Sequence, residues 1–224
     1  MPDETKTTTR CKVLLVEDHP MFRDHLAQLI NRDLGMSVCG ETDNIRDALR
    51  LVQDTQPDIA IVDITLKGSS GLELLKDIKA QGFPVNVLVL SMHDEELYAE
   101  RSLRAGAKGY ITKNEASTEV LKAIRCVMQG EVYASKQMTA KLLDRLTQRR
   151  AQPELEGLET LADRELEVFQ MLGRGKSTRQ IAQTLGLGES TVETYRARIK
   201  EKLRLRSAAE LYLRAGQWVR DHGS

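Results

Sequence analysis

The feature that most constrains the fold is a regular alternation of short apolar runs with longer amphipathic stretches between residues 11 and 130. Five runs rich in leucine and β-branched residues are short enough to be buried strands: "KVLLVE", "MSVCGE", "DIAIVD", "NVLVLS" and "KGYIT". Stretches with helical spacing, such as "HPMFRDHLAQLINRD" and "STEVLKAIRCVMQ", follow or separate them. Five βα repeats predict an α/β domain, a doubly wound five-stranded parallel sheet with helices on both faces.

The strand pattern stops after residue 130, and this change predicts a second domain. The stretch "SKQMTAKLLDRLTQ" has helical spacing, and "RRAQPELEG" has the charged, proline-containing composition of a linker. From residue 158 onward the pattern is entirely helical. We therefore expect a disordered tail at 1–10, the α/β domain at 11–130, a helical linker at 131–157 and a small all-α domain at 158–224.

Charge and hydropathy exclude several classes of protein. The formal net charge of the 224 residues is zero, so the chain as a whole indicates neither a nucleic acid nor a membrane as partner, and any basic patch must be local. Apolar runs such as "IAIV" and "VLVL" are far shorter than the roughly 20 residues of a membrane span. The polar start "MPDETKTTTR" does not resemble a signal peptide, and the three cysteines have no metal-ligand spacing. We expect a cytoplasmic protein with reduced cysteines and no membrane partner.

Polar side chains stand at the carboxyl ends of four predicted strands. Glu17 and Asp18 end the first strand, Asp63 and Ser91 end the third and fourth, and Lys113 follows the fifth. Because the carboxyl ends of parallel strands meet at one edge of a sheet, these groups are expected to converge. Closely packed carboxylates are unfavourable unless a cation neutralises them, and their oxygens suit Mg²⁺. The pattern predicts a magnesium site formed by Glu17, Asp18 and Asp63.

The same arrangement indicates phosphoryl transfer. A metal and Lys113 can hold the oxygens of a phosphoryl group while a carboxylate attacks in line. Taken singly, each residue is better explained as a solvated loop residue, because loops collect Asp and Glu. Four strand ends in order, each with the group that the chemistry needs, favour the functional interpretation. His19 and His93 flank the same edge and are interpreted as ordinary loop histidines.

The blocks "VEDH", "VDITLKGSSGLELL", "VLSMHDE" and "AGAKGYITK" resemble the receiver domain of bacterial two-component response regulators, which has a flavodoxin-like fold. The resemblance implies that Asp63 accepts a phosphoryl group from the phosphohistidine of a sensor histidine kinase. It also implies that Asp18 binds Mg²⁺ directly and that Glu17 acts beside it, often through water. The main-chain carbonyl of Thr65 would be a further metal ligand.

The resemblance also assigns the groups around the phosphoryl site. Lys113 would pair with the phosphoryl group. Ser91 and Tyr110 would be the switch pair, in which Ser91 moves toward the new oxygens and Tyr110 turns inward behind it. Two positions depart from the family: Glu17 stands where aspartate is also common, and Lys67 stands where the family usually has a proline. The loop that contains Lys67 is expected to be more mobile for this reason.

A phosphohydrolase of the haloacid dehalogenase kind is the alternative from the enzyme class, since it also uses Mg²⁺ and an aspartyl phosphate. Such an enzyme needs a second acid two residues after the nucleophile to protonate the leaving group. Here that residue is Thr65. Without a general acid the site is expected to accept a phosphoryl group and to release it slowly, which suits a switch.

The second domain contains a helix-turn-helix pattern, "STRQIAQTLGLGESTVETYRARIKEKL". Ser190 is placed to N-cap the second helix, and Val192, Ile199 and Leu203 form its buried stripe. Between residues 191 and 206 six basic residues face two acidic ones, which makes a local basic patch. A charged helix alone is more often a solvated amphipathic helix, but the turn and the neighbouring helix favour DNA phosphates as its partner.

From "LADRE" onward, residues 158–217 resemble the LuxR-type DNA-binding domain of response regulators of the NarL and FixJ kind. Ala162 replaces the usual capping threonine of this opening, so Asp163 is a second candidate for the cap. The predicted DNA contacts are Glu193, Thr194 and Ala197 toward the bases, Lys176, Arg196 and Lys200 toward phosphates, and Thr191 beside them on the outer face.

Together these patterns predict a phosphorylation-dependent, DNA-binding transcription regulator and not an enzyme. Its expected partners are a sensor histidine kinase, double-stranded DNA, a second copy of the chain when phosphorylated, and RNA polymerase as a further partner that such a regulator could contact. The unphosphorylated protein is expected to be monomeric or autoinhibited. The alternative is a receiver that acts mainly through protein partners, with weak or vestigial DNA binding.

Overall fold

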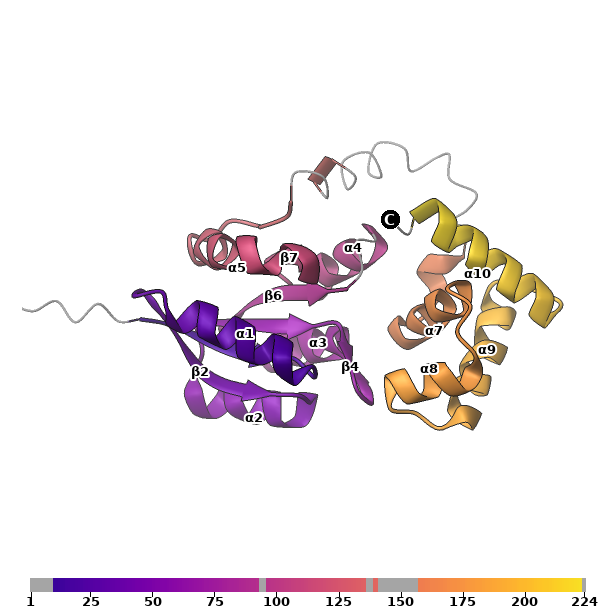
Figure 1. The fold of residues 1–224 in the computed structure, drawn as a ribbon, viewed down its shortest axis with the longest axis horizontal. Helices are drawn as coiled ribbons and strands as arrows, with labels where there is room; N and C mark the ends of the chain where they lie inside the picture. The colour runs from indigo at the N-terminus through magenta and orange to yellow at the C-terminus, as the bar shows by residue number, and fades with distance from the viewer. Residues whose placement is uncertain (1–9, 93–95, 136–138, 141–156, 223–224) are drawn as a thin grey trace, which may run out of the picture.

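The computed structural model describes the chain except for residues 1–9, 93–95, 136–138, 141–156 and 223–224. The described residues therefore exclude nearly all of the predicted tail and most of the predicted helical linker. They also exclude His93. The remainder forms an N-terminal α/β domain and a C-terminal domain of helices (Figure 1). Within these parts of the chain, no helix is both long and apolar enough to cross a membrane.

The N-terminal domain has the five predicted strands, with helices between them. Its elements are, in chain order, β1 (Cys11–Val16), α1 (Pro20–Asn31), β2 (Met36–Thr42), α2 (Ile45–Thr55), β3 (Ile59–Asp63), β4 (Thr65–Leu66), β5 (Ser69–Ser70), α3 (Gly71–Gln81), β6 (Asn86–Ser91), α4 (Glu96–Ala105), β7 (Gly109–Thr112) and α5 (Lys113–Met128). The main sheet has the strand order β2-β1-β3-β6-β7, and all its pairs are parallel. The predicted α/β fold is confirmed.

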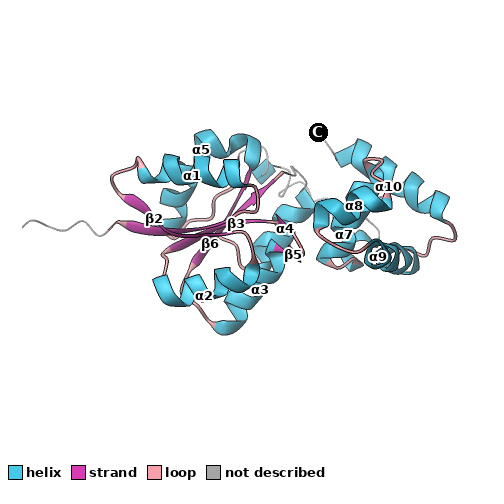
Figure 2. Ribbon diagram, turned by 60° about the horizontal axis from the view of Figure 1, so that its bottom comes forward, coloured by secondary structure: helices cyan, strands magenta, loops and turns pink. Residues whose placement is uncertain are grey.

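Alternating side chains of the buried strands build two apolar layers. Along β1, Val13 and Leu15 pack with α1 and α5, whereas Leu14 and Val16 pack on the side of α2 and α3. Figure 2 shows the sheet edge-on between these two layers of helices. Because both faces are covered, a ligand can reach the sheet only at its ends.

The C-terminal domain consists of η2 (Leu158–Thr160), α7 (Asp163–Gly173), α8 (Thr178–Leu185), α9 (Glu189–Lys202) and α10 (Ala208–His222). The rings of Phe169 on α7 and Trp218 on α10 lie 6.0 Å apart at a tilt of 56° and fill its core. Helices α8 and α9 are the two members of the predicted helix-turn-helix. The predicted buried positions Val192 and Ile199 are fully buried.

Two predictions about helix starts are wrong or incomplete. Ser190 does not cap α9, because the main-chain N–H groups of Thr191 and Val192 already bond to the carbonyl of Gly188, so the helix begins before Ser190. Asp163 does not cap α7 either. It is the first residue of that helix, and the N–H of Ala162 is satisfied by the carboxylate of Glu165 at 2.8 Å.

Candidate functional site

The carboxyl ends of the strands bring the predicted acidic residues together. Glu17 directly follows β1, Asp63 ends β3, and Lys113 is the first residue of α5. The Nζ atom of Lys113 donates to Oε1 of Glu17 at 2.8 Å and to Oδ2 of Asp63 at 2.8 Å. All three side chains are at least 95% buried. A strand-to-helix junction places the lysine here, since Thr112 both ends β7 and caps α5.

Burial sets the electrostatics of this cluster. Burial and the neighbouring charge of Glu17 raise the pKa of Asp63 to about 7, although the ammonium group of Lys113 opposes the shift. Burial disfavours the charge on Lys113, but the carboxylates of Asp63 and Glu17 outweigh it and raise the lysine pKa. Lys113 therefore stays charged, and it balances only part of the negative charge that the carboxylates carry.

Asp18 completes an oxygen-rich group that could hold a metal ion. Ligand atoms of Glu17, Asp18, His19 and Asp63 lie within 4.8 Å of one another. The Oδ1 atom of Asp18 is buried and makes no hydrogen bond of good geometry with a described residue, its near neighbour being the exposed imidazole of His19. A buried carboxylate oxygen of this kind is well satisfied by a cation, and carboxylate oxygens together with a main-chain carbonyl are ligands that Mg²⁺ accepts. The donor set fits the predicted ion.

His19 was not predicted to take part in this cluster. Its Nδ1 atom lies 2.9 Å from Oε1 of Glu17 and 2.8 Å from Oδ1 of Asp18, while the side chain is 65% exposed. An exposed imidazole on a loop can move away without disturbing the core. Its position directly after the acidic pair was the available signal in the sequence.

The loop after β3 supplies main-chain groups to the same cluster. The N–H of Thr65 donates to Oδ1 of Asp63 at 3.3 Å, and the N–H of Lys67 donates to Oδ2 of Asp18 at 3.2 Å. Gly71 is required where the loop turns back, because a Cβ there would lie 2.0 Å from the carbonyl oxygen of Asp63. The mobility predicted for the loop stays a prediction, but its contact with Asp18 was not foreseen.

The predicted switch residues lie on β6, which pairs with the strand of Asp63, and on β7 at the sheet edge beyond it. Ser91 ends β6 and is buried, and Tyr110 on β7 is 2% exposed. The sequence prediction had Tyr110 turning inward after phosphorylation. In this structure the ring is already inside, in the apolar cluster that contains Val89 and Ala107. The role of Ser91 and Tyr110 as a switch pair stays a prediction.

Most of the predicted DNA contacts lie on the open surface of α9. Glu193, Thr194 and Ala197 are exposed, as are Thr191 and the preceding Lys176, and Lys200 is half-buried. Arg196 is less accessible than these residues, because its guanidinium is largely covered and packs 5.3 Å from the ring of Tyr212. It donates to the carboxylate of Glu193 at 2.5 Å and to the hydroxyl of Thr178 at 3.0 Å. The hydroxyl of Thr178 and the charge of Arg196 also lower the pKa of Glu193.

Comparison with known sequences assigns both domains. The profile of the response regulator receiver domain matches residues 13–125, and that of the bacterial regulatory proteins of the luxR family matches residues 159–215. The chain is a LuxR-type response regulator. It is therefore a phosphorylation-dependent, DNA-binding transcription regulator, a class of protein that regulates and does not catalyse the turnover of a substrate.

Relatives share this organisation over most of their length. The virulence transcription regulator BvgA of Bordetella pertussis is 34% identical over 89% of this chain and 94% of its own. A LuxR-family response regulator from Aurantimonas sp. SI85-9A1 is 30% identical, with a TM-score of 0.59 over 62% of this chain and all of that one. RcsB of Salmonella enterica serovar Typhimurium, solved bound to the promoter rprA, is only 19% identical but has the same fold, with a TM-score of 0.61 over 93% of this chain and 99% of its own.

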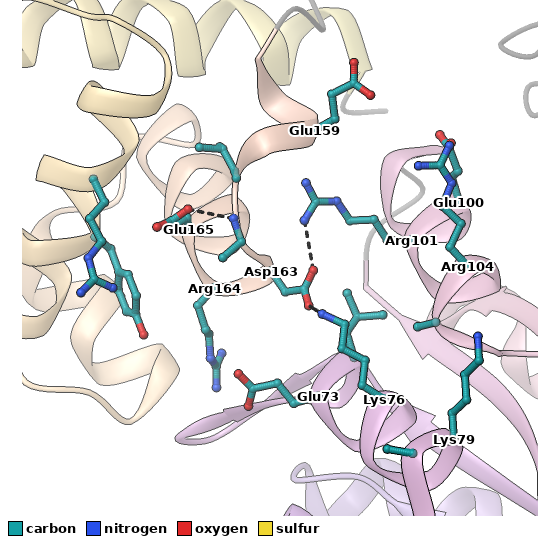
Figure 3. A pocket seen from close by; sticks show the side chains of 17 residues that line it. Glu73, Lys76, Lys79, Glu100, Arg101, Arg104, Glu159, Asp163, Arg164 and Glu165 are labelled. Atoms are coloured by element: carbon teal, nitrogen blue, oxygen red, sulfur yellow. Dashed lines mark hydrogen bonds and ion pairs between the residues drawn. The ribbon is translucent and has the colours of Figure 1, made fainter. Parts of the chain in front are cut away.

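The receiver domain and the LuxR-type domain of this response regulator contact each other through an ionic group centred on Asp163 (Figure 3). The Asp163 carboxylate accepts from Arg101 Nη1 at 3.0 Å and from Lys76 Nζ at 2.7 Å, so the first turn of α7 is tied to α4 and α3. Arg101 Nη2 also donates to the carbonyl of Leu158 at 2.9 Å. Lys76, Arg101 and Asp163 line a cavity of about 810 Å³ between the domains, and Tyr195 of α9 also lines it.

A second contact joins α7 and α8 to the loop after β3. Arg164 Nη2 donates to the carbonyl of Leu66 at 3.0 Å, and the N–H of Gly68 donates to the carbonyl of Leu185 at 2.7 Å. Arg164 also pairs with Glu167, and burial raises the pKa of Glu167 to about 7 although Arg164 opposes the shift. The two bonds between the domains were not predicted, because each involves a main-chain group that has no signature in the sequence.

Proposed function

We propose that Asp63 is the residue phosphorylated by a sensor histidine kinase, in a site that holds Mg²⁺ through Asp18, Asp63 and the main-chain carbonyl of Thr65, with Glu17 acting beside them. The observation that carries this proposal is the geometry of Asp63. Its carboxylate is buried at the end of β3, bonded to Lys113, and lies within the same group of acidic ligand atoms. Mg²⁺ at this position would neutralise charge that develops on the phosphoryl oxygens.

The chain's own side chains account for the transfer step. The Asp63 carboxylate forms an O–P bond as the P–N bond of the phosphohistidine breaks, and the imidazole leaves with the bonding electrons. Lys113, already 2.8 Å from Asp63, pairs with the phosphoryl oxygens. The side chain two residues after Asp63 is the hydroxyl of Thr65, which is not a general acid at neutral pH. Beyond transfer from the phosphohistidine, the chain should therefore catalyse only its own phosphorylation from a small donor and its own slow dephosphorylation.

DNA is the proposed target of the second domain. Glu193, Thr194 and Ala197 are accessible on α9 and have sizes and hydrogen-bonding groups suited to base edges, while Lys176 and Lys200 are suited to phosphates. Thr191 lies beside them. Arg196 can reach a phosphate only by giving up its bonds to Glu193 and Thr178. The promoter complex of RcsB, whose fold this chain shares, supports the same use of this domain.

Regulation would act through the contact between the domains. A phosphoryl group adds about −1.5 to −2 charges next to Asp63, and Ser91 can donate to one of its oxygens. The docked arrangement leaves the base-facing side chains of α9 accessible, whereas Tyr195 lines the cavity between the domains. Separation of the domains would free that flank of α9 and permit a homodimer on a two-fold symmetric operator, within reach of RNA polymerase.

The proposal assigns a receiver domain at 11–130, a linker at 131–157 and a DNA-binding domain at 158–224, working in the cytoplasm where the kinase donor and DNA are both present. Incubation with Mg²⁺ and a small phosphodonor, followed by mass spectrometry of peptides, tests its first step. Phosphate should be found on Asp63, and Asp63→Asn or removal of Mg²⁺ should abolish the label. Equal labelling of the Asp63→Asn chain would refute the assignment.

A further inference from the structure

A single main-chain amide links the acidic site to the contact between the domains. The N–H of Lys67 donates to Oδ2 of Asp18 at 3.2 Å. The two residues beside it in the chain both bond to the LuxR-type domain: the carbonyl of Leu66 accepts from Arg164 at 3.0 Å, and the N–H of Gly68 donates to Leu185 at 2.7 Å. Three consecutive residues thus contact the metal ligand and the other domain.

The docked domain leaves this turn little freedom. Gly186, at the C-terminal end of α8, approaches the turn so closely that an added Cβ would lie 3.1 Å from the nitrogen of Gly68 and 3.6 Å from Cβ of Lys67. Main-chain bonds on both sides of Lys67 fix the direction of its N–H while the domains are in contact. When the domains separate, both bonds are lost and the N–H is held only by the hairpin of β4 and β5.

The fixed N–H orients the carboxylate of Asp18. Because Lys67 holds Oδ2, the other oxygen of the same carboxylate, Oδ1, is the one left for a cation. The imidazole of His19 lies 2.8 Å from this buried atom, and being 65% exposed it can move aside when a cation binds. A ligand that is already held in its binding orientation loses less conformational freedom when it binds. Contact between the domains should therefore favour cation binding at Asp18.

We infer that docking of the LuxR-type domain strengthens divalent-cation binding at Asp18 through the main-chain N–H of Lys67, and that the bound cation strengthens docking by the same factor. The equality follows from thermodynamic linkage between two binding equilibria. The inference rests on the proposed Mg²⁺ site and extends it: the acceptor site is best loaded with metal while the domains are still in contact.

This link depends on the residue at which the chain departs from its family. A proline at position 67 has no N–H and could not bond to Asp18. The turn itself would accept proline, because Leu66 pairs with Ser69 and Gly68 has φ of 74°, the arrangement of a type II turn in which position 67 is the favoured site for proline. Lys67→Pro therefore removes the donor and keeps the turn, and Lys67→Ala is the matched control that keeps the N–H.

The test measures how Mg²⁺ affects docking in the full-length chain. Hydrogen exchange of the Gly68 amide reports the opening of the interface, since that N–H bonds across it. In the natural chain and in Lys67→Ala, saturating Mg²⁺ should slow the exchange by about two- to tenfold, the change that one hydrogen bond makes in an equilibrium constant. In Lys67→Pro, Mg²⁺ should leave the exchange unchanged, and calorimetry should give a Kd for Mg²⁺ weaker by a similar factor.

Each result has a defined meaning. If Gly68 exchanges at the same rate or faster with Mg²⁺ in the natural chain, or responds alike in Lys67→Pro and Lys67→Ala, the inference is overturned while the metal site stands. If calorimetry detects no Mg²⁺ binding to the natural chain, or equal binding to Asp18→Asn, the proposed metal site fails and the inference fails with it. Circular dichroism checks that Lys67→Pro is folded.

Discussion

Replacing Asp163 by asparagine should weaken the contact between the domains by about 2 kcal/mol. The Asp163 carboxylate is 11% exposed and pairs with two cations of the receiver domain. The pair with Lys76 is largely solvated, because that lysine is 60% exposed, and it contributes about 0.5 kcal/mol. The pair with Arg101, which is 14% exposed and hydrogen-bonded, contributes about 1.5 kcal/mol.

This loss should appear in the docking equilibrium alone. Asparagine keeps the shape of the side chain. The interaction of the aspartate charge with the start of α7 is present in both the docked and the separated state, so its loss cancels in the docking equilibrium. A change of about 2 kcal/mol alters the equilibrium roughly thirtyfold. Exchange of the Gly68 amide should accelerate by that factor, while the amide of Leu88, inside the receiver sheet, should not change.

A matched variant separates the two ion pairs. Lys76→Ala should accelerate exchange of the Gly68 amide only about two- to threefold, because an exposed pair contributes little. If Asp163→Asn left Gly68 as protected as before, the contact would not be held by this ionic group. Equal acceleration at Gly68 and Leu88 would mean that the variant had destabilised the receiver domain itself.

Three further predictions concern the buried charges and the DNA-binding surface. Because the folded-state pKa of Glu167 is raised to about 7, its contribution to stability is complete below its ordinary pKa and is lost as pH rises through 7. Urea unfolding followed by the fluorescence of the single tryptophan, Trp218, should therefore give a free energy of unfolding that falls as pH rises toward 7. Glu167→Gln should make this pH dependence smaller. Lys113→Met leaves two buried carboxylates without their cation, so the free energy of unfolding from circular dichroism should fall by about 3 kcal/mol, with part of the loss recovered in Mg²⁺. Lys200→Ala should reduce the salt dependence of DNA affinity by about one unit for all sequences, whereas Thr194→Ala should change the preference among operators, as competition binding can measure; equal effects of both variants on random and specific DNA would remove the base-reading role.

The sheet and the acidic edge could be predicted from the sequence because their signals are local. A run such as "IAIVD" marks a strand buried on both faces, and parallel connections force the ends of such strands to one edge. Asp63 and Lys113, fifty residues apart, were therefore expected to meet, and they do. The start of α9 was misplaced because Ser190 is a good capping residue, but the glycine before it provides the turn and the helix begins earlier.

The contacts between the domains could not be predicted, because nothing local encodes them. Arg164 belongs to an opening motif of the second domain, yet its guanidinium bonds to a main-chain carbonyl 98 residues away. A main-chain amide has no sequence signature, so the bond from Lys67 to Asp18 was equally hidden. The lysine at that position is visible in the sequence, but a side chain carries no information about the bond that its main-chain N–H makes.

The most direct test of the central claim is DNA affinity measured with and without phosphorylation of Asp63. Operator fragments selected from the genome by the natural chain would be titrated at fixed salt, with Mg²⁺ present throughout and a small phosphodonor added to one series. The account predicts that the phosphodonor strengthens binding by the natural chain and has no effect on Asp63→Asn. Equal affinity in both series for the natural chain, or an equal gain in the Asp63→Asn chain, would contradict it.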